Sequence, residues 1–203
     1  MTGVFIKNER RITPVGTAPD AEQLLQRCQK GDQAALRDLM RLYQERVFQF
    51  LLRVSGDSSL AEEATVECFY RVWTKCSQHR DGANVEAWIF RIAHRALLDL
   101  ARRQQRWWRR LIAGSRTREA DAHSGPLERL IEADEEVQRK VAIESALANL
   151  KDEDRALIHL YYFEGRALSE ISMIMNTSRD ALKMRLMRVR QRLAKLLDDE
   201  NDR

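Results

Sequence analysis

The residues of this sequence that are best suited to chemistry are basic, and they gather on two stretches of the chain. Seven Lys or Arg residues and one acid lie between Arg179 and Lys195. Seven arginines and one acid, Asp99, lie between Arg91 and Arg110. Because guanidinium and ammonium groups bind phosphate oxygens and the acceptor edge of guanine, both stretches predict contact with a nucleic acid.

The C-terminal basic stretch has the pattern of a helix-turn-helix. A short apolar helix ends near Asn176, a residue that tolerates left-handed backbone angles, and Ser178 can cap the helix that follows. The second helix has one apolar side, formed by Leu182, Leu186, Val189 and Leu193. Such a helix can enter the major groove of DNA. The alternative is a basic, solvated helix on an ordinary bundle, because helical periodicity alone is common.

The other basic stretch is accompanied by aromatic residues, namely Trp88, Phe90, Trp107 and Trp108. Arginines follow a phosphate backbone and aromatic faces stack on unpaired bases, so this helix favours single-stranded DNA. The loop predicted at 76–85 comes directly before it and can receive a base taken out of the stack. The alternative is that Trp88 and Phe90 are core residues and that the arginines only keep the helix soluble.

A third group of residues is acidic and lies on the outer side of a helix predicted over 59–75. Glu62, Glu63 and Glu67 share this side with Val66 and Tyr70. An apolar residue inside an exposed acidic strip suits a protein partner better than it suits DNA. The alternative is a face that is only solvated.

Composition indicates the architecture that positions these groups. The 203 residues include only 8 Gly and 3 Pro, too few turn residues for an all-β sandwich or barrel, and 44% are hydrophobic, enough for a core. The net charge is +4 (35 − 31), which is only mildly basic. The periodicity predicts an all-α protein made of two small helical domains joined by a flexible linker. We expect an N-terminal arm at 1–19, a domain at 20–110, a linker at 111–136 and a second domain at 137–203.

Several classes of protein are disfavoured. No run approaches the ~20 apolar residues of a membrane span, and the first eleven residues are too polar for a signal peptide, so a cytoplasmic protein is expected. Cys76 and His79 are three residues apart, but no second pair completes a metal site. The sequence has no Gly-rich phosphate loop and no recognisable catalytic triad. We therefore expect no enzyme activity, no cofactor, no metal and no small-molecule substrate.

With these features in place, the chain resembles the extracytoplasmic-function (ECF) group of bacterial RNA polymerase sigma factors. Residues 25–103 resemble sigma region two, through Gly31–Asp32, Ala61–Glu62–Glu63, Glu67, Phe69, Trp73, Trp88, Arg91–Ile92–Ala93, Asp99 and Arg102–Arg103. Residues 143–196 resemble region four, through Asp154–Arg155, Glu164–Gly165, Glu170–Ile171 and the run from Lys183 to Arg190. No helical region three lies between them, which is typical of this small group.

The resemblance implies a role for each group of residues. Region two would bind the β′ coiled coil of core RNA polymerase through Glu62, Glu63, Val66, Glu67 and Tyr70. It would melt and hold the −10 element through His79, Trp88, Phe90, Arg91, Arg95, Arg102 and Arg103. Region four would bind the β flap and recognise the −35 element as duplex through Arg179, Lys183, Met184, Arg185, Met187, Arg188 and Arg190. An anti-sigma factor, soluble or membrane-bound, would regulate the protein.

The sequence departs from the family pattern at several of these positions. Val66 stands where Gln is common and Arg95 where Asn is common, while His79 replaces a frequent aromatic residue. Met184 replaces a frequent Ser; a thioether donates no hydrogen bond to a base but can contact a thymine methyl group. The main rival interpretation is a helix-turn-helix regulator without a polymerase role, and it leaves the arginine–tryptophan helix unexplained.

Overall fold

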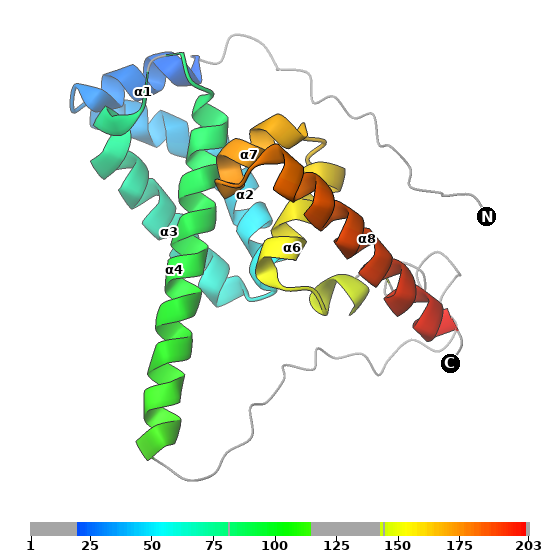
Figure 1. The fold of residues 1–203 in the computed structure, drawn as a ribbon. Helices are drawn as coiled ribbons and strands as arrows, with labels where there is room; N and C mark the ends of the chain where they lie inside the picture. The colour runs from blue at the N-terminus through cyan, green and yellow to red at the C-terminus, as the bar shows by residue number, and fades with distance from the viewer. Residues whose placement is uncertain (1–19, 81, 115–142, 144, 202–203) are drawn as a thin grey trace, which may run out of the picture.

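The computed structural model describes residues 20–80, 82–114, 143 and 145–201, and for residues 107–114 and 198–201 it describes the backbone alone. Within these ranges every regular element is helical and none is a strand (Figure 1), so the prediction of an all-α protein is confirmed. The predicted arm at 1–19 and the linker from residue 115 onward lie outside the described residues, as do the side chains of Trp107 and Trp108.

The N-terminal half consists of four long helices, which are α1 (Ala21–Gln29), α2 (Gln33–Ser55), α3 (Ser58–Lys75) and α4 (Val85–Gly114). Aspartate side chains cap the first three: Asp20 accepts a hydrogen bond from the Glu22 amide, Asp32 from Ala34 and Asp57 from Leu60. Such caps satisfy backbone N–H groups that have no partner inside the helix. The helix starts at these positions therefore follow directly from the sequence.

Helix α4 runs to Gly114, four residues beyond the expected end of the first domain at residue 110. Its first half packs against α2 and α3, while its C-terminal part projects below the other helices in Figure 1. The Phe50 and Phe90 rings meet in the core between α2 and α4, with centroids 5.4 Å apart. A short 3-10 turn, Cys76–Gln78, connects α3 to the loop before α4.

The C-terminal half contains α6 (Asp152–Ile158), a π-helical turn (His159–Phe163), α7 (Leu168–Met175) and α8 (Arg179–Asn201). Asn176 adopts the predicted left-handed conformation (φ 53°), and the Ser178 hydroxyl accepts from the Ala181 amide at 3.3 Å. Three acids occupy the first turn of α6, where they favour the positive end of the helix dipole. The predicted helix-turn-helix is therefore confirmed as α7, the turn at Asn176 and α8.

The two halves pack against each other, a feature that the sequence did not predict. Helix α7 lies against α4, and α6 lies against α2 (Figure 1). The buried side chains of both halves form one continuous hydrophobic cluster. Among the described residues, no helix is both long and apolar enough to cross a membrane.

Candidate nucleic-acid and polymerase interfaces

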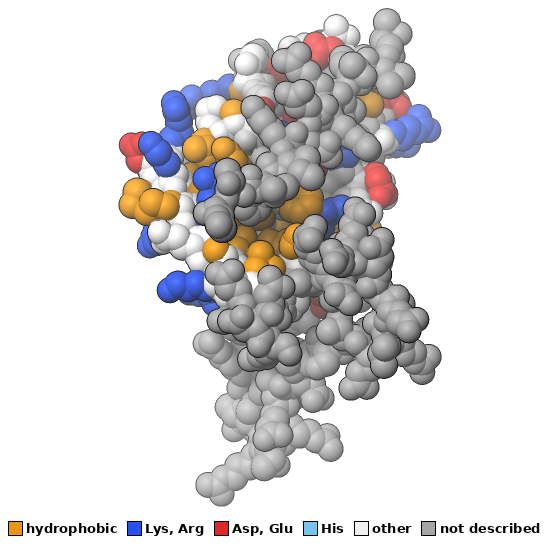
Figure 2. Space-filling model, turned by 90° about the vertical axis from the view of Figure 1, so that its right-hand side faces the viewer, with side chains coloured by type: hydrophobic (Ala, Val, Ile, Leu, Met, Phe, Trp, Pro, Cys, Tyr) orange, Lys and Arg blue, Asp and Glu red, His pale blue; other side chains and the backbone are white. Residues whose placement is uncertain are grey.

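The DNA-facing candidates of α8 lie opposite its buried side. Leu182, Leu186 and Val189 are buried against α6 and α7, whereas Lys183, Met184, Met187 and Arg188 are exposed. On the face that Figure 2 presents, Lys and Arg side chains surround gathered hydrophobic side chains over the described part of the surface. An exposed basic face on the second helix of a helix-turn-helix is the arrangement that places side chains in a major groove.

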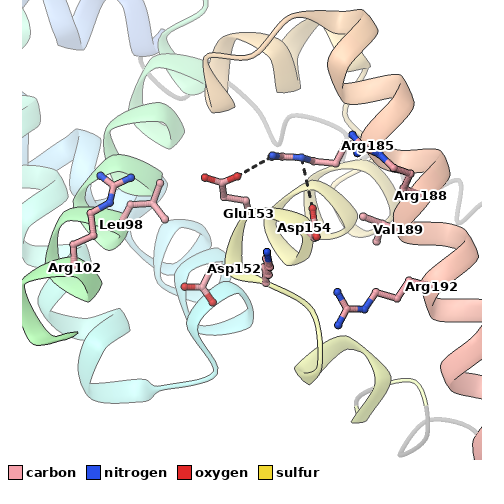
Figure 3. A pocket seen from close by; sticks show the side chains of 10 residues that line it. Leu98, Arg102, Asp152, Glu153, Asp154, Arg185, Arg188, Val189 and Arg192 are labelled. Atoms are coloured by element: carbon pink, nitrogen blue, oxygen red, sulfur yellow. Dashed lines mark ion pairs between the residues drawn. The ribbon is translucent and has the colours of Figure 1, made fainter. Parts of the chain in front are cut away.

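Two of the α8 residues predicted to contact DNA form contacts with other side chains of the C-terminal half. Arg185 forms ion pairs with Glu153 (Nη1–Oε2 2.9 Å) and Asp154 (Nε–Oδ1 3.6 Å), as Figure 3 shows. The Arg190 guanidinium lies over the rings of Tyr161 and Tyr162, 5.7 Å and 5.5 Å from their centroids. The sequence grouped these arginines with the free ones, because periodicity does not reveal a partner on another helix.

A cavity of about 540 Å³ lies between α4, α6 and α8 (Figure 3). Its basic lining residues are Arg102 of α4, Lys151 just before α6, and Arg185, Arg188 and Arg192 of α8, and the acids at the start of α6 form one of its walls. Asp152 is paired with Arg155 at 3.2 Å, and Glu153 and Asp154 are paired with Arg185. The remaining cations extend the positive surface of α8 toward α4.

Helix α4 presents its predicted −10 residues in two different states. Arg95, Arg102 and Arg103 are exposed, and Trp88 is half-buried. Phe90 and His79, by contrast, are buried: the Phe90 ring lies beneath the Arg166 guanidinium at 4.5 Å, and His79 meets Trp88 edge-on at 5.2 Å. Both residues were predicted to contact DNA. Phe90 is buried because α4 is covered from more than one side, whereas His79 lies in the loop before α4 and packs against Trp88.

The first turns of α4 are also in contact with the C-terminal half. Arg91 donates a hydrogen bond to Asn176 Oδ1 at 3.3 Å, so a predicted −10 residue touches the turn of the helix-turn-helix. Arg91 loses solvent on this side, and burial with the nearby Arg95 lowers the pKa of its guanidinium. The part of α4 expected to hold single-stranded DNA is therefore partly covered in this conformation.

A cluster of charged residues joins the two halves behind Phe90. Arg46 binds Glu86 (2.8 Å) and Glu164 (3.3 Å), and Arg166, almost fully buried, binds both carboxylates as well. The His159 imidazole, with Nε2 3.7 Å from Glu164 Oε1, acts together with Arg46 and Arg166 to lower the pKa of Glu164 to about 2. Burial works to raise the pKa of Glu86, but its two arginine partners keep it below the usual range. We call these residues, Arg46, Glu86, Glu164 and Arg166, the seam cluster.

No sequence pattern predicted that the residues of the seam cluster would lie together. Its members come from α2, α4 and the segment after the π-helical turn, and Arg46 and Glu164 are 118 residues apart in the chain. No periodicity or motif connects charges on separate elements. The one available signal was Glu164–Gly165 within the resemblance to region four, and it gave no partner.

The outer face of α3 carries the predicted polymerase-binding strip. Val66 and Tyr70 are strongly exposed, at 73% and 63%, and Glu62 and Glu63 are exposed beside them. Glu67 differs, because it is paired with Arg71 at 2.6 Å, and Arg71 also reaches Asp99 on α4 at 2.7 Å. The exposed side chains therefore form an apolar pair with an acidic border, while Glu67 helps to fix α3 on α4.

The described residues contain no group of three or more His, Cys, Asp or Glu side chains that could hold a metal ion. All three cysteines are free and buried. Burial raises the pKa of Cys28 to about 11 and that of Cys68 to about 12, so these thiols stay protonated and unreactive near neutral pH.

A helix-turn-helix with an exposed basic face, joined to a second basic helix and an apolar strip, defines a helical DNA-binding protein with a protein-binding surface. Comparisons with known proteins agree with that class. Residues 39–107 match the family model of sigma-70 region 2, and residues 146–197 match that of sigma-70 region 4. The chain is similar to the ECF RNA polymerase sigma factor SigM of Bacillus subtilis (strain 168), with 28% identity over 78% of this chain and 93% of SigM.

Similarity extends over most of the chain in other relatives too. The ECF RNA polymerase sigma factor SigK of Mycobacterium tuberculosis (strain ATCC 25618 / H37Rv) is 27% identical, over 91% of this chain and 97% of SigK. The chain belongs to the ECF group of RNA polymerase sigma factors. It is therefore a promoter-recognition subunit that binds core RNA polymerase and directs transcription initiation, rather than a regulator that acts without the polymerase.

Two solved structures share the fold. One is the sigma factor RpoE bound to the anti-sigma factor NepR from Bartonella quintana, with a TM-score of 0.59 and 22% identity over 80% of this chain and 96% of that one. The other is CnrH bound to the cytosolic domain of CnrY, with a TM-score of 0.62 and 20% identity over 89% and 99% of the two chains. The arrangement of helices is thus one that other sigma factors adopt.

Proposed function

We propose that this sigma factor performs promoter recognition with three separate surfaces. The exposed face of α8 binds the −35 element as duplex DNA, through Arg179, Lys183, Met184, Met187 and Arg188. The single observation that carries this assignment is that the basic face of α8 is exposed directly opposite its buried leucines. Arg185 and Arg190 support the same helix from behind through α6 and the tyrosines, and so position it rather than touch bases.

The second surface is the part of α4 from Trp88 to Arg103, which holds the −10 element after melting. Trp88 offers a half-buried aromatic face to a base, and Arg91, Arg95, Arg102 and Arg103 offer charge to the backbone. Because Arg91 contacts Asn176 and Phe90 lies under Arg166, this surface becomes fully available only when α7 moves away from α4. Promoter binding therefore includes separation of the two halves.

The third surface is the outer face of α3, which docks on the polymerase coiled coil. Val66 and Tyr70 supply the apolar centre, and Glu62 and Glu63 supply a charged border. Interfaces commonly combine such an apolar centre with a polar rim. Catalysis of RNA synthesis belongs to the polymerase, and the sigma factor acts in the cytoplasm with it.

An anti-sigma factor is the expected regulator. Of the two similar structures described above, RpoE is a sigma factor bound to the anti-sigma factor NepR, and CnrH is bound to the cytosolic domain of CnrY. We propose that this chain has a partner of the same kind, and that its binding keeps the promoter-facing surfaces apart from DNA.

In vitro transcription with purified core RNA polymerase tests the function as a whole. The protein and core enzyme, without an anti-sigma factor, are supplied with a fragment library from the source genome, and the 5′ ends of the transcripts are mapped. We expect discrete start sites preceded by shared −10 and −35 sequences. Transcripts that are the same with and without the protein would contradict the proposal.

A matched pair of variants tests the polymerase surface separately. Val66→Glu should lower core binding at least tenfold, because it places a charge at the centre of an apolar contact. Met173→Glu, at another exposed apolar position, on α7, should leave core binding unchanged. Equal binding by the Val66 variant would remove α3 from the polymerase interface.

A further inference from the structure

The exposed face of α8 has an apolar centre and basic edges. At about 100° per residue, Lys183, Met187, Met184 and Arg188 follow one another around the helix within about 140°. The buried side, centred on Leu182 and Leu186, lies about half a turn away from the middle of this arc. We call the four exposed residues the methionine stripe.

Both methionines are accessible, with 52% of Met184 and 46% of Met187 exposed. The Arg188 side chain folds back beside Met184, with Nε donating to the Met184 carbonyl at 3.4 Å. Exposure of two thioethers on a helix gives the folded protein no stability, since burial of apolar area is what stabilises. Their placement therefore points to an occupant that supplies apolar contact from outside.

The surrounding charge indicates what that occupant is. Between Arg179 and Lys195 there are seven basic residues and one acid, so the occupant carries negative charge close to the stripe. Duplex DNA combines a charged backbone with base edges in the major groove. Among those edges only thymine presents an apolar group, its 5-methyl, whereas the others offer hydrogen-bond donors or acceptors.

Building on the proposed role of α8 in binding the −35 element, we infer that Met184 and Met187 recognise the 5-methyl groups of one or two adjacent thymines. The two side chains are about 4.5 Å apart along the helix axis, close to the ~3.4 Å rise between neighbouring base pairs. Lys183 and Arg188 bind guanine or phosphate at either side of these thymines. A thioether is flexible and polarizable, which suits contact with a methyl group of variable position.

Replacement of thymine by deoxyuridine tests the inference. The −35 segment of the DNA is randomised, so no particular −35 sequence has to be known beforehand. Deoxyuridine keeps every hydrogen-bonding group of thymine and lacks only the methyl. A promoter pool with a randomised −35 segment is made with either dTTP or dUTP and is selected by holoenzyme, the full chain bound to core polymerase. We expect thymine to be enriched at one or two adjacent positions in the first pool, by about fourfold for each buried methyl, and the same positions to lose their preference in the second pool.

Variants assign the effect to the methionines. Met184→Ser and Met187→Ser should each abolish one thymine preference in the dTTP pool and leave guanine preferences in place. Met173→Ser is the control, because Met173 is a methionine of α7 with 47% exposure that lies outside the stripe, and it should leave every preference unchanged. All three substitutions are at exposed positions, and an unchanged unfolding midpoint establishes that each variant is folded.

The possible results separate the inference from the function on which it rests. Persistence of the thymine preference in the dUTP pool, or in both serine variants, would overturn methyl recognition and would leave the stripe as a surface for a protein helix. Absence of any −35 preference in either pool would instead contradict the role of α8 in the −35 element, and the inference would fail with it.

Discussion

The two long basic helices of this protein differ in how much of their charged face is free. Helices α4 and α8 each carry a run of seven basic residues against one acid. The face of α8 lies open, with Lys183 and Arg188 exposed. On α4, Arg95, Arg102 and Arg103 are exposed, but the first turns are partly covered by the other half of the chain, because Arg91 contacts Asn176 and Phe90 lies beneath Arg166. Equal charge therefore does not mean equal availability to DNA.

This difference gives the two promoter elements different requirements. In the proposed assignment, duplex DNA binds the exposed face of α8 without a rearrangement of the closed structure, whereas a single strand binds the first turns of α4 only after the halves separate. Separation is opposed by the ion pairs around Glu86 and by the hydrophobic cluster that both halves share. Buried ion pairs lose much of their Coulomb energy to desolvation, so such an interface can be stable and still be displaced by a strongly binding partner.

The largest effect is expected when Arg166 is removed. Arg166→Ala leaves the half-buried Glu86 and Glu164 with one cation fewer and uncovers the Phe90 ring. Loss of one partner from a buried charge pair costs about 3–5 kcal/mol. We expect the free energy of unfolding, measured in urea, to fall by this amount, and binding of a single-stranded −10 oligonucleotide by α4 to become tighter.

Arg53→Ala is the control for this prediction, because Arg53 is an exposed arginine over the Phe163 ring at 5.3 Å. It should change the free energy of unfolding by less than about 1 kcal/mol. If the two variants lose equal stability, or if Arg166→Ala does not change single-strand binding, the seam cluster does not cover α4.

The next effect concerns DNA and compares the two helices directly. Arg188→Ala should weaken binding of the full chain to a −35 duplex by about 1–3 kcal/mol if it contacts a base, whereas Arg91→Ala should leave it unchanged. The measurement is fluorescence anisotropy with the duplex found by selection, at several salt concentrations. If Arg188 instead contacts a phosphate, Arg188→Ala would weaken binding to all duplex sequences alike and would lower the salt slope of binding by about one. Weaker duplex binding by the Arg91 variant would show that α4 also contacts the −35 element.

The exposed face of α8 could be predicted from the sequence more fully than the exposed face of α4. For α8, the caps, the turn at Asn176 and the apolar period all lie within a short segment, so local rules predicted both the helix and its exposed face. For α4, the exposed face depends on Arg166 and Asn176, which come from far along the chain. Phe90 was assigned to DNA because an aromatic residue beside arginines fits a base-binding site, and its cover by the distant Arg166 leaves no local signal. His79 was assigned through the resemblance to region two, and it packs against Trp88, which is close to it in the sequence.

A smaller effect is expected from pH, because α4 also contains a buried histidine. Burial lowers the pKa of His94 to about 4. The charge of Glu153 raises this pKa, and that of Arg95 lowers it. Between pH 6.5 and 4 the folded protein keeps His94 neutral while the unfolded chain is protonated, so unfolding takes up a proton and stability falls as the pH drops. From pH 7.5 to 5.5 this amounts to about 1 kcal/mol of unfolding free energy.

Comparison with His94→Leu isolates this contribution. Urea unfolding at the two pH values should show that the unfolding free energy falls by about 1 kcal/mol more in the wild type than in the variant. The other titrating groups are the same in both proteins, so the difference belongs to His94. Glu164, with a pKa of about 2, contributes stability that is present above its ordinary pKa of 4.5 and therefore stays constant over this interval. An equal loss in both proteins would assign the pH dependence to another group.

The smallest effect is expected at the turn where α7 meets α4. Asn176→Gly removes the exposed hydrogen bond to Arg91 but keeps the left-handed φ of 53°, which glycine adopts freely, so the free energy of unfolding should change by no more than about 0.5 kcal/mol. Asn176→Ala removes the same bond and adds backbone strain, so it should cost about 1 kcal/mol. Because the glycine variant loses only the Arg91 contact, its single-strand binding should stay at the wild-type level while that of Arg166→Ala rises. If Asn176→Gly frees α4 as fully as Arg166→Ala does, the exposed contact rather than the seam cluster keeps α4 covered, and the difference between the two basic helices is governed by one surface hydrogen bond.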